Sequence, residues 1–194
     1  MIFMKMMKIK YMAFLAATVL IFLTSTQLNA QKFVTKNGHI KFYSETPIET
    51  IEAHNRQVNT ALDATTGDFV FKVLMKSFEF KKALMQEHFN ENYVESDKYP
   101  NATFIGKVVN ISQIDFTKEG AYDALVEGDL TIHGETQKIS EKGTFTVMPG
   151  DKLHGMCKFN VRVADYKIKI PGAVMQNISE ILEVTVDVEL TKLQ

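Results

Sequence analysis

Histidine is the residue type in this chain best suited to bind a metal ion or transfer a proton, and the sequence holds five. A zinc site built from sequence neighbours has a spacing such as HxH or HExxH, which brings two imidazoles of one element to the same ion. No pair here has such a spacing, and Glu87-His88 is interpreted as part of a solvated helix face. We therefore predict no metal site from these histidines: His39, His54, His88, His133 and His154.

Residues for nucleophilic catalysis are equally sparse. Cys157 is the single cysteine, it lies among apolar residues, and no sequence neighbour would activate it. The chain has no GxSxG motif and no glycine-rich nucleotide loop. We expect neither an enzyme nor a cofactor, and we predict that Cys157 is buried. A single cysteine also allows no internal disulfide, so stability must come from the hydrophobic core.

The N-terminal segment has the order of parts found in a secretory signal peptide. Lys5, Lys8 and Lys10 precede the uncharged, mostly apolar stretch Tyr11–Leu23, and a cleavage site follows at Ala30. The apolar stretch is shorter than the roughly 20 residues that cross a bilayer. We predict that residues 1–30 are removed, which leaves a periplasmic or secreted protein without a stable membrane anchor.

Residues 31–194 are expected to form one domain. Cleavage would remove three lysines and no acidic residue, which changes the formal net charge from −1 to −4. A weakly acidic domain lacks the basic surface that binds nucleic acid, so nucleic-acid binding is not expected.

Alternation of apolar and other residues with period two dominates this domain and predicts strands with one buried face. The clearest strands are Tyr122–Ile132, Leu153–Val163 and Leu182–Leu190. Shorter or weaker patterns predict further strands at Gly38–Ser44, Glu49–Asn59, Asp68–Met75, Ala102–Ser112 and Lys138–Val147.

One segment departs from this alternation. Phe80–Val94 has apolar residues at helical spacing and no Gly or Pro, which predicts a helix of about three turns. Met85 and Phe89 lie one turn apart, so the helix is expected either to act as a lid or to plug one end of the sheet. A second helical turn is predicted near Val174–Ile178, after Pro171.

At least eight antiparallel strands with an apolar inner face indicate an all-β barrel or sandwich. Closure into an up-and-down barrel removes the exposed edges of a large open sheet. A barrel of about eight strands is either filled by its side chains or holds one small ligand, and periodicity alone does not distinguish the two.

Two motifs resemble those of the YceI-like family. Asp97–Phe104, with the sequence DKYPNATF, is similar to a family segment that follows a short helix and begins a strand. Val126–Lys138, with the sequence VEGDLTIHGETQK, is similar to a hairpin of the family. The resemblance implies an extended antiparallel lipocalin-like β-barrel with one short capping helix. It also implies a tunnel that a polyisoprenoid or an isoprenoid quinone can occupy. Phe80–Phe89 and Val161–Tyr166 depart from the family pattern.

A long apolar ligand is held mainly by buried area, at about 0.8 kcal/mol per methylene before the costs of binding. Glycines inside strands leave room for a bend or a ligand. Each lining candidate is also an ordinary core candidate. The candidate ligand-binding residues are Phe71, Val73, Met85, Phe89, Phe104, Val126, Leu130, Phe145, Phe159 and Val161, and the strand glycines are Gly106, Gly128, Gly143 and Gly155.

The first hypothesis is therefore an exported carrier of an apolar, lipid-like small molecule, for which a continuous apolar channel is needed. The alternative is a filled barrel that binds a protein partner in the cell envelope, for which Leu125 and an exposed edge of the N-terminal strand are the hints. An enzyme of lipid or quinone metabolism is the least favoured hypothesis. The sequence leaves a homodimer open.

Overall fold

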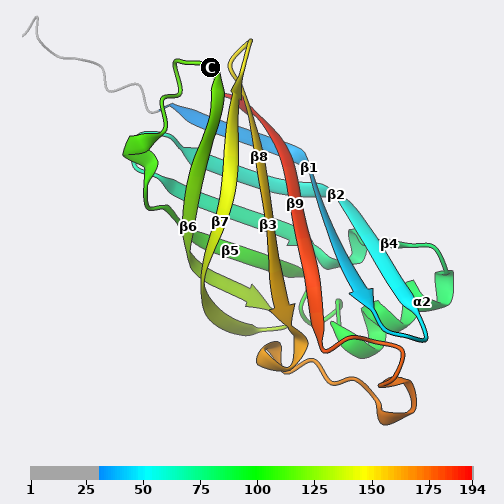
Figure 1. Ribbon diagram of the computed structural model, residues 1–194. Coiled ribbons are helices and arrows are strands. Elements are labelled where there is room, and N and C mark those ends of the chain that lie inside the picture. Colours follow the sequence, from blue (N-terminus) through cyan, green and yellow to red (C-terminus); the bar gives the residue numbers. More distant parts are fainter. Residues whose placement is uncertain (1–30, 194) are drawn as a thin grey trace, which may run out of the picture.

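The computed structural model describes residues 31–193 and shows a closed antiparallel β-barrel (Figure 1). The strand order is β1-β9-β8-β7-β6-β5-β3-β2, and pairing of β1 with β2 closes the barrel; the short β4 adds to β2. This confirms the predicted lipocalin-like barrel. The strands are β1 Lys32–Glu45, β2 Thr50–Asp63, β3 Asp68–Leu74, β4 Glu79–Phe80, β5 Asn101–Val108, β6 Gly120–Ile132, β7 Glu135–Met148, β8 Lys152–Arg162 and β9 Ile181–Lys192.

The N-terminal strand has no exposed edge, which corrects the hint of a free pairing surface. β1 pairs with β2 on one side and with β9 on the other. β1 also begins before Gly38, the predicted first residue, and Phe33 is already buried in the core. A register irregularity between Thr35 and Ile40 interrupts the alternation, so the sequence pattern did not extend back to this part of the strand. Leu125 is half-buried on the barrel wall.

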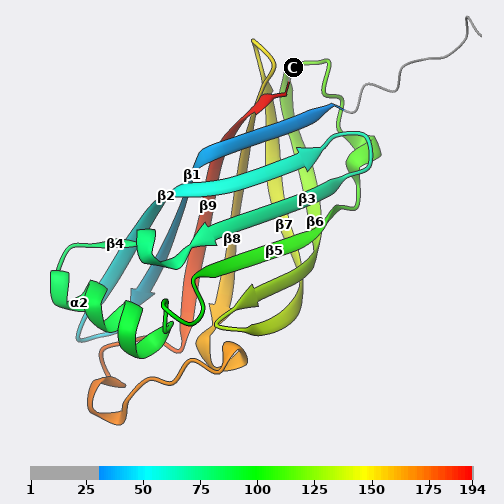
Figure 2. The same cartoon turned by 180° about the vertical axis from the view of Figure 1, so that it is seen from behind.

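The predicted helix over Phe80–Val94 is shorter than expected. Phe80 pairs with Ala53 as part of β4, so α2 spans only Ala83–His88 before a π-helical turn, η2 (Phe89–Tyr93). These elements lie across one end of the barrel, which we term the lid end (Figure 2). Further 3₁₀ turns are η1 Met75–Ser77, η3 Ile111–Gln113, η4 Val163–Tyr166 and η5 Gly172–Val174. The turn predicted near Val174–Ile178 is thus found earlier in the chain, directly after Pro171, and ends at Val174.

The core divides along the barrel axis into two clusters. One contains Leu62, Leu153 and Leu190 and reaches the end opposite the lid, which we term the plug end. There Phe116, from the loop between β5 and β6, stacks on Phe33 at 5.6 Å between ring centroids. The second cluster lies under the lid and is rich in aromatic rings: Phe42, Phe78, Phe80 and Phe89.

The two family-like motifs meet at the lid end. The ring of Tyr99 lies against His133, with 4.5 Å between centroids, and against Gly134 in the hairpin turn. His133 Nε2 lies 2.7 Å from Glu95 Oε2, and its Nδ1 lies 3.1 Å from the carbonyl oxygen of Tyr166. The hairpin between β6 and β7 is thereby fixed to the segment that enters β5.

Candidate ligand-binding cavities

An apolar cavity of about 110 Å³ lies inside the barrel around its middle. Its walls come from β1, β3, β5, β6, β7, β8 and β9, and nearly all the side chains are apolar. Because β-strand side chains alternate between the two faces, every second residue of these strands faces the cavity. An apolar cavity of roughly 150 Å³ can hold one benzene, so this space fits about one branched hydrocarbon unit.

A second cavity of about 300 Å³ lies beneath the lid. Met85 and Phe89 face it from the lid, and Val163 and Ile168 face it from the segment that joins β8 to β9. Its size is at the lower limit of the range usual for small-molecule sites.

The opening of the lid cavity carries a small polar network. Lys82 Nζ donates to Glu49 Oε1 at 2.9 Å, and Asn177 Nδ2 donates to Glu49 Oε2 at 3.2 Å. The hydrogen bond from Lys82, followed by that from Asn177, lowers the pKa of Glu49. The lysine charge is thus paired, and the network joins the lid to the β1–β2 turn and to the segment before β9.

The continuous apolar channel that we expected for a carrier is not found: in the part of the chain that the structure describes, the apolar space along the axis is divided into two cavities. Among residues 31–193 the two cavities share no lining residue. Val184 packs against both core clusters and lies between the cavities. A chain longer than a few carbons would therefore occupy one cavity and project from it, or displace side chains between them.

Nine of the ten candidate ligand-binding residues line a cavity. Val161 lines neither, because it is buried in the core near the lid end of β8, next to Leu182 of β9. Whether the nine contact a ligand stays a prediction. Phe71, Val73, Phe104, Val126, Leu130, Phe145 and Phe159 face the first cavity, and Met85 and Phe89 face the second.

The strand glycines have different roles. Gly106 and Gly128 oppose each other in β5 and β6, and the Phe104 ring already fills the space beside them, with its Cζ 2.5 Å from where a Cβ of Gly106 would be. Gly143 and Gly155, in β7 and β8, line the first cavity. A Cβ at Gly143 would lie 2.8 Å from the carbonyl oxygen of Met156, so this glycine allows close approach of the β8 backbone. A Cβ at Gly155 would lie 3.0 Å from Cε1 of Phe145, so this glycine makes room for that ring.

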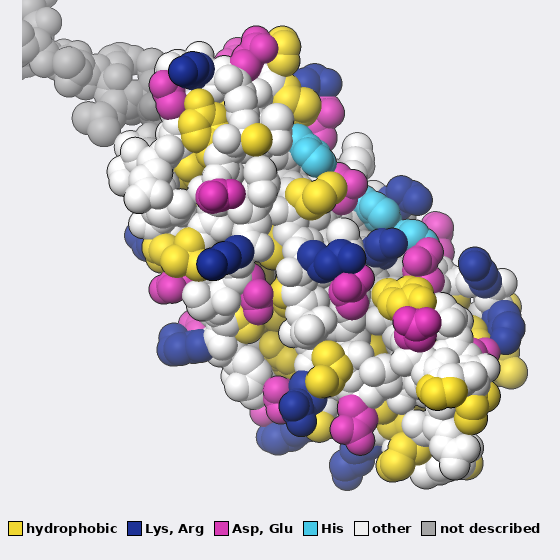
Figure 3. All heavy atoms as spheres, in the orientation of Figure 1, with side chains coloured by type: hydrophobic (Ala, Val, Ile, Leu, Met, Phe, Trp, Pro, Cys, Tyr) yellow, Lys and Arg dark blue, Asp and Glu magenta, His cyan; other side chains and the backbone are white. Residues whose placement is uncertain are grey.

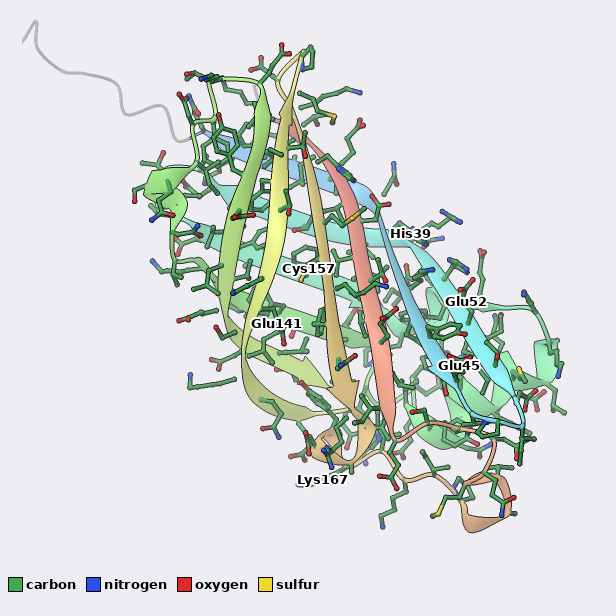
Figure 4. All side chains as sticks on the ribbon, in the orientation of Figure 1. His39, Glu45, Glu52, Glu141, Cys157 and Lys167 are labelled. Atoms are coloured by element: carbon green, nitrogen blue, oxygen red, sulfur yellow. The ribbon has the colours of Figure 1, made fainter. Side chains whose placement is uncertain are left out.

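Sequence reasoning missed two polar residues in the wall of the first cavity. Glu141 of β7 and Cys157 of β8 are half-buried and face it (Figure 4), so Cys157 is not the fully buried core residue that was predicted. Burial raises the pKa of Glu141. Burial, followed by the nearby charge of Glu141, raises the pKa of Cys157 to about 11, which makes the thiol a weak nucleophile.

The segment between η4 and β9 was also missed as a cavity wall. Ile168, Ile170, Val174 and Ile178 line the lid cavity from this irregular stretch. Because the stretch has no regular period, periodicity provides no signal for which of its residues point inward.

Three of the histidines, His39, His54 and His154, lie in a row on the outer surface of the barrel. His39 Nε2 lies 3.0 Å from His54 Nδ1, and His154 Nε2 lies 2.8 Å from Asp187 Oδ1. Burial, followed by the charge of Arg56, lowers the pKa of His39. In residues 31–193 no group of three or more His, Cys, Asp or Glu side chains is placed to hold a metal ion.

The fold and its cavities define a closed antiparallel barrel with an apolar interior, the architecture of lipocalin-like binding proteins. The YceI-like domain family matches residues 21–190, and the chain belongs to that family. None of the helices described within residues 31–193 has the length and hydrophobicity to cross a membrane.

Solved structures with the same fold support this assignment. A polyisoprenoid-binding domain from Saccharophagus degradans, implicated in plant cell wall breakdown, matches with a TM-score of 0.74 and 12% identity, over 85% of this chain and 100% of that one. BcnA of Burkholderia cenocepacia matches at 0.65, with 12% identity over 78% of this chain and 95% of the other. The YceI protein of Campylobacter jejuni matches at 0.56, with 15% identity over 73% and 84%.

Sequence relatives cover less of the chain. A UPF0312 protein of Pseudomonas putida (strain W619) is 32% identical over 101 residues, which are 50% of this chain and 48% of that protein. A UPF0312 protein of strain GB-1 matches to the same extent. The match thus spans about half the length of these relatives.

Proposed function

We propose that this protein is an exported carrier that binds the hydrocarbon chain of an isoprenoid lipid or isoprenoid quinone inside its barrel, and that it does not convert it. The observation that carries the proposal is the pair of apolar cavities, which line up along one barrel. The family assignment and the polyisoprenoid-binding neighbour support it.

The physical basis of binding is the transfer of hydrocarbon from water. At about 0.8 kcal/mol per methylene, burial of roughly ten carbons supplies several kcal/mol before the costs of binding. At the lid cavity the positive charge of Lys82 is paired with Glu49, and at the first cavity Glu141 carries a negative charge when it is ionised. The walls of both cavities therefore favour an uncharged ligand over an anionic one.

The sequence of residues 1–30 supports export, and this segment lies outside the described residues. Fractionation of cells that express the full chain is expected to recover it from the periplasm or medium. N-terminal sequencing is expected to begin at Gln31, and recovery of intact chain from the cytoplasm would argue against export.

Ligand binding is tested first on the protein as cells make it. Organic extraction of the purified protein, followed by mass spectrometry, is expected to release an isoprenoid lipid. The extracted protein is then titrated with all-trans-retinol, a neutral fluorescent isoprenoid alcohol. An empty extract together with no retinol binding would refute the proposal.

Substitutions in the first cavity locate the site. Val126→Trp and Leu130→Trp put an indole into the cavity, and displacement of about two buried methylenes lowers retinol affinity by about tenfold. Glu127→Trp is the matched control, because Glu127 is exposed on the outer face of the same strand. Equal affinity in all three variants would show that the first cavity is not the site.

A further inference from the structure

The barrel wall is not hydrogen-bonded along its full height between β7 and β8. The two strands pair only from Gly143 with Cys157 to Met148 with Lys152. Toward the lid end both strands continue, β7 back to Glu135 and β8 on to Arg162, and each pairs there only with its outer neighbour, β6 or β9. Figure 1 shows the two ribbons diverging in this region, which we term the side window.

Within residues 31–193, side-chain hydrogen bonds cross the window at its two ends. At the upper end Cys157 Sγ donates to the carbonyl oxygen of Lys142 at 3.3 Å. At the lower end Gln137 Nε2 donates to the carbonyl oxygen of Asp165 at 2.9 Å.

Lys138 and Lys158, on the two outer rims, are directed away from the window. Lys138 of β7 pairs with Asp129 of β6 at 3.0 Å, and Lys158 of β8 pairs with Glu183 of β9 at 2.8 Å. Both ion pairs run to the outer neighbour strand, so neither holds the two rims together. Figure 3 views this side of the barrel and shows hydrophobic side chains recessed between charged ones.

The first cavity opens to solvent through this window. Where β7 and β8 pair, their inward side chains Phe145 and Leu153 are 3% and 0% exposed. Along the window, the inward residues Ile139, Glu141 and Phe159 are only half-buried, and all three also line the cavity. A continuous apolar surface thus runs from the cavity wall to the outside.

We propose that the apolar chain enters and leaves the first cavity sideways, by separation of β7 and β8 at the side window. This proposal rests on the proposed function and specifies its route. The ends of the barrel are less favourable routes, because Phe116 and Ile114 pack over the plug end and the residues around Val184 separate the first cavity from the lid cavity. A sideways path needs no ladder hydrogen bond to break along the unpaired segment.

Glu141 gives the route a chemical preference. Its carboxylate lies at the cavity wall beside the window, and the residues that line this cavity include no lysine or arginine. A chain that ends in a hydroxyl or amine can donate a hydrogen bond to this carboxylate as it passes, whereas a phosphate or carboxylate end is repelled.

The test is a reversible tether across the window. Ser140 and Asn160 are exposed on the outer rims, where the β7–β8 register would place them opposite each other. Ser140→Cys and Asn160→Cys are combined with Cys157→Ser and joined by a bis-maleimide with a cleavable disulfide. Stopped-flow fluorescence then follows retinol binding and release before and after cleavage. The tether is expected to slow both rates by at least about tenfold, with little change in affinity, and cleavage is expected to restore them.

Two tethers at other places are the controls. Thr146→Cys with His154→Cys joins a pair that the ladder already connects and that lines neither cavity, and Lys76→Cys with Asp97→Cys replaces an ion pair at the base of the lid. Neither is expected to change the rates. If the lid tether slows binding and the window tether does not, the route is through the lid and the inference is overturned while the carrier function stands. If untethered protein binds no retinol, the carrier function itself fails.

Discussion

Replacement of Gly134 with alanine tests how the two family-like motifs hold each other. Gly134 has φ +78° in the β6–β7 turn, and a Cβ there would lie 2.6 Å from Cε1 of Tyr99. Gly150, in the β7–β8 turn, has nearly the same backbone conformation, φ +77°, but no atom within 4 Å of its would-be Cβ. The two glycines therefore separate backbone strain from steric conflict.

The expected magnitudes follow from these two geometries. A left-handed conformation costs an alanine about 1–2 kcal/mol, which is the whole effect expected for Gly150→Ala. Gly134→Ala adds the conflict with the Tyr99 ring, and overpacking of this kind costs about 1–3 kcal/mol. The total for Gly134→Ala is about 2–5 kcal/mol, toward the lower value if the half-buried ring of Tyr99 moves outward.

Urea unfolding of residues 31–194, monitored by circular dichroism, measures both variants. Adding Tyr99→Ala removes the steric partner, so in that background Gly134→Ala is expected to cost no more than Gly150→Ala does. Equal destabilisation by Gly134→Ala and Gly150→Ala in the unaltered background would refute the steric contact. So would a Gly134→Ala cost that Tyr99→Ala leaves unchanged.

Three further predictions concern single side chains. Asn55→Ala removes a fully buried amide that donates to the Leu74 carbonyl oxygen and accepts from the Gln57 N–H. Urea unfolding should show that the free energy of unfolding falls by about 1–3 kcal/mol, whereas Asn37→Ala, at an exposed position, should lower it by less than about 0.5 kcal/mol. Burial raises the pKa of Glu141, so the stability that its protonated form contributes is present below about pH 4.5 and is lost as the pH rises through the folded-state pKa. Glu141→Gln should flatten this part of the curve of unfolding free energy against pH, and an unchanged curve would contradict the assignment. The pKa of Cys157 is about 11, against an ordinary value of 9.0, so at pH 8 the thiol should react with iodoacetamide about 100-fold more slowly in the folded protein than in the urea-unfolded chain. Glu141→Gln should accelerate the reaction in the folded protein, and equal rates in the folded and unfolded chains would show that the thiol is not shielded.

The barrel could be predicted from the sequence because its signal is local and repeated. Alternation in Tyr122–Ile132 and in Leu182–Leu190 marks one face for burial, and each of these segments became part of a barrel strand. Phe80 shows the limit of such reasoning. Its spacing fits a helix, yet pairing with Ala53 and packing against Phe42 and Phe89 place it in a strand, since tertiary contacts outweigh a weak local preference.

The sequence by itself determined which side chains face inward, and therefore that the interior is apolar. Only the tertiary structure decided where that interior stays empty. A Cβ at Gly106 would meet the Phe104 ring, and a Cβ at Gly143 would meet the carbonyl oxygen of Met156, so a glycine in an alternating strand did not by itself mark an empty space. The side window likewise depends on where the β7–β8 ladder stops. Cavities and openings are differences between the volume that a closed sheet encloses and the volume that its side chains occupy, and no local pattern in the chain records that difference.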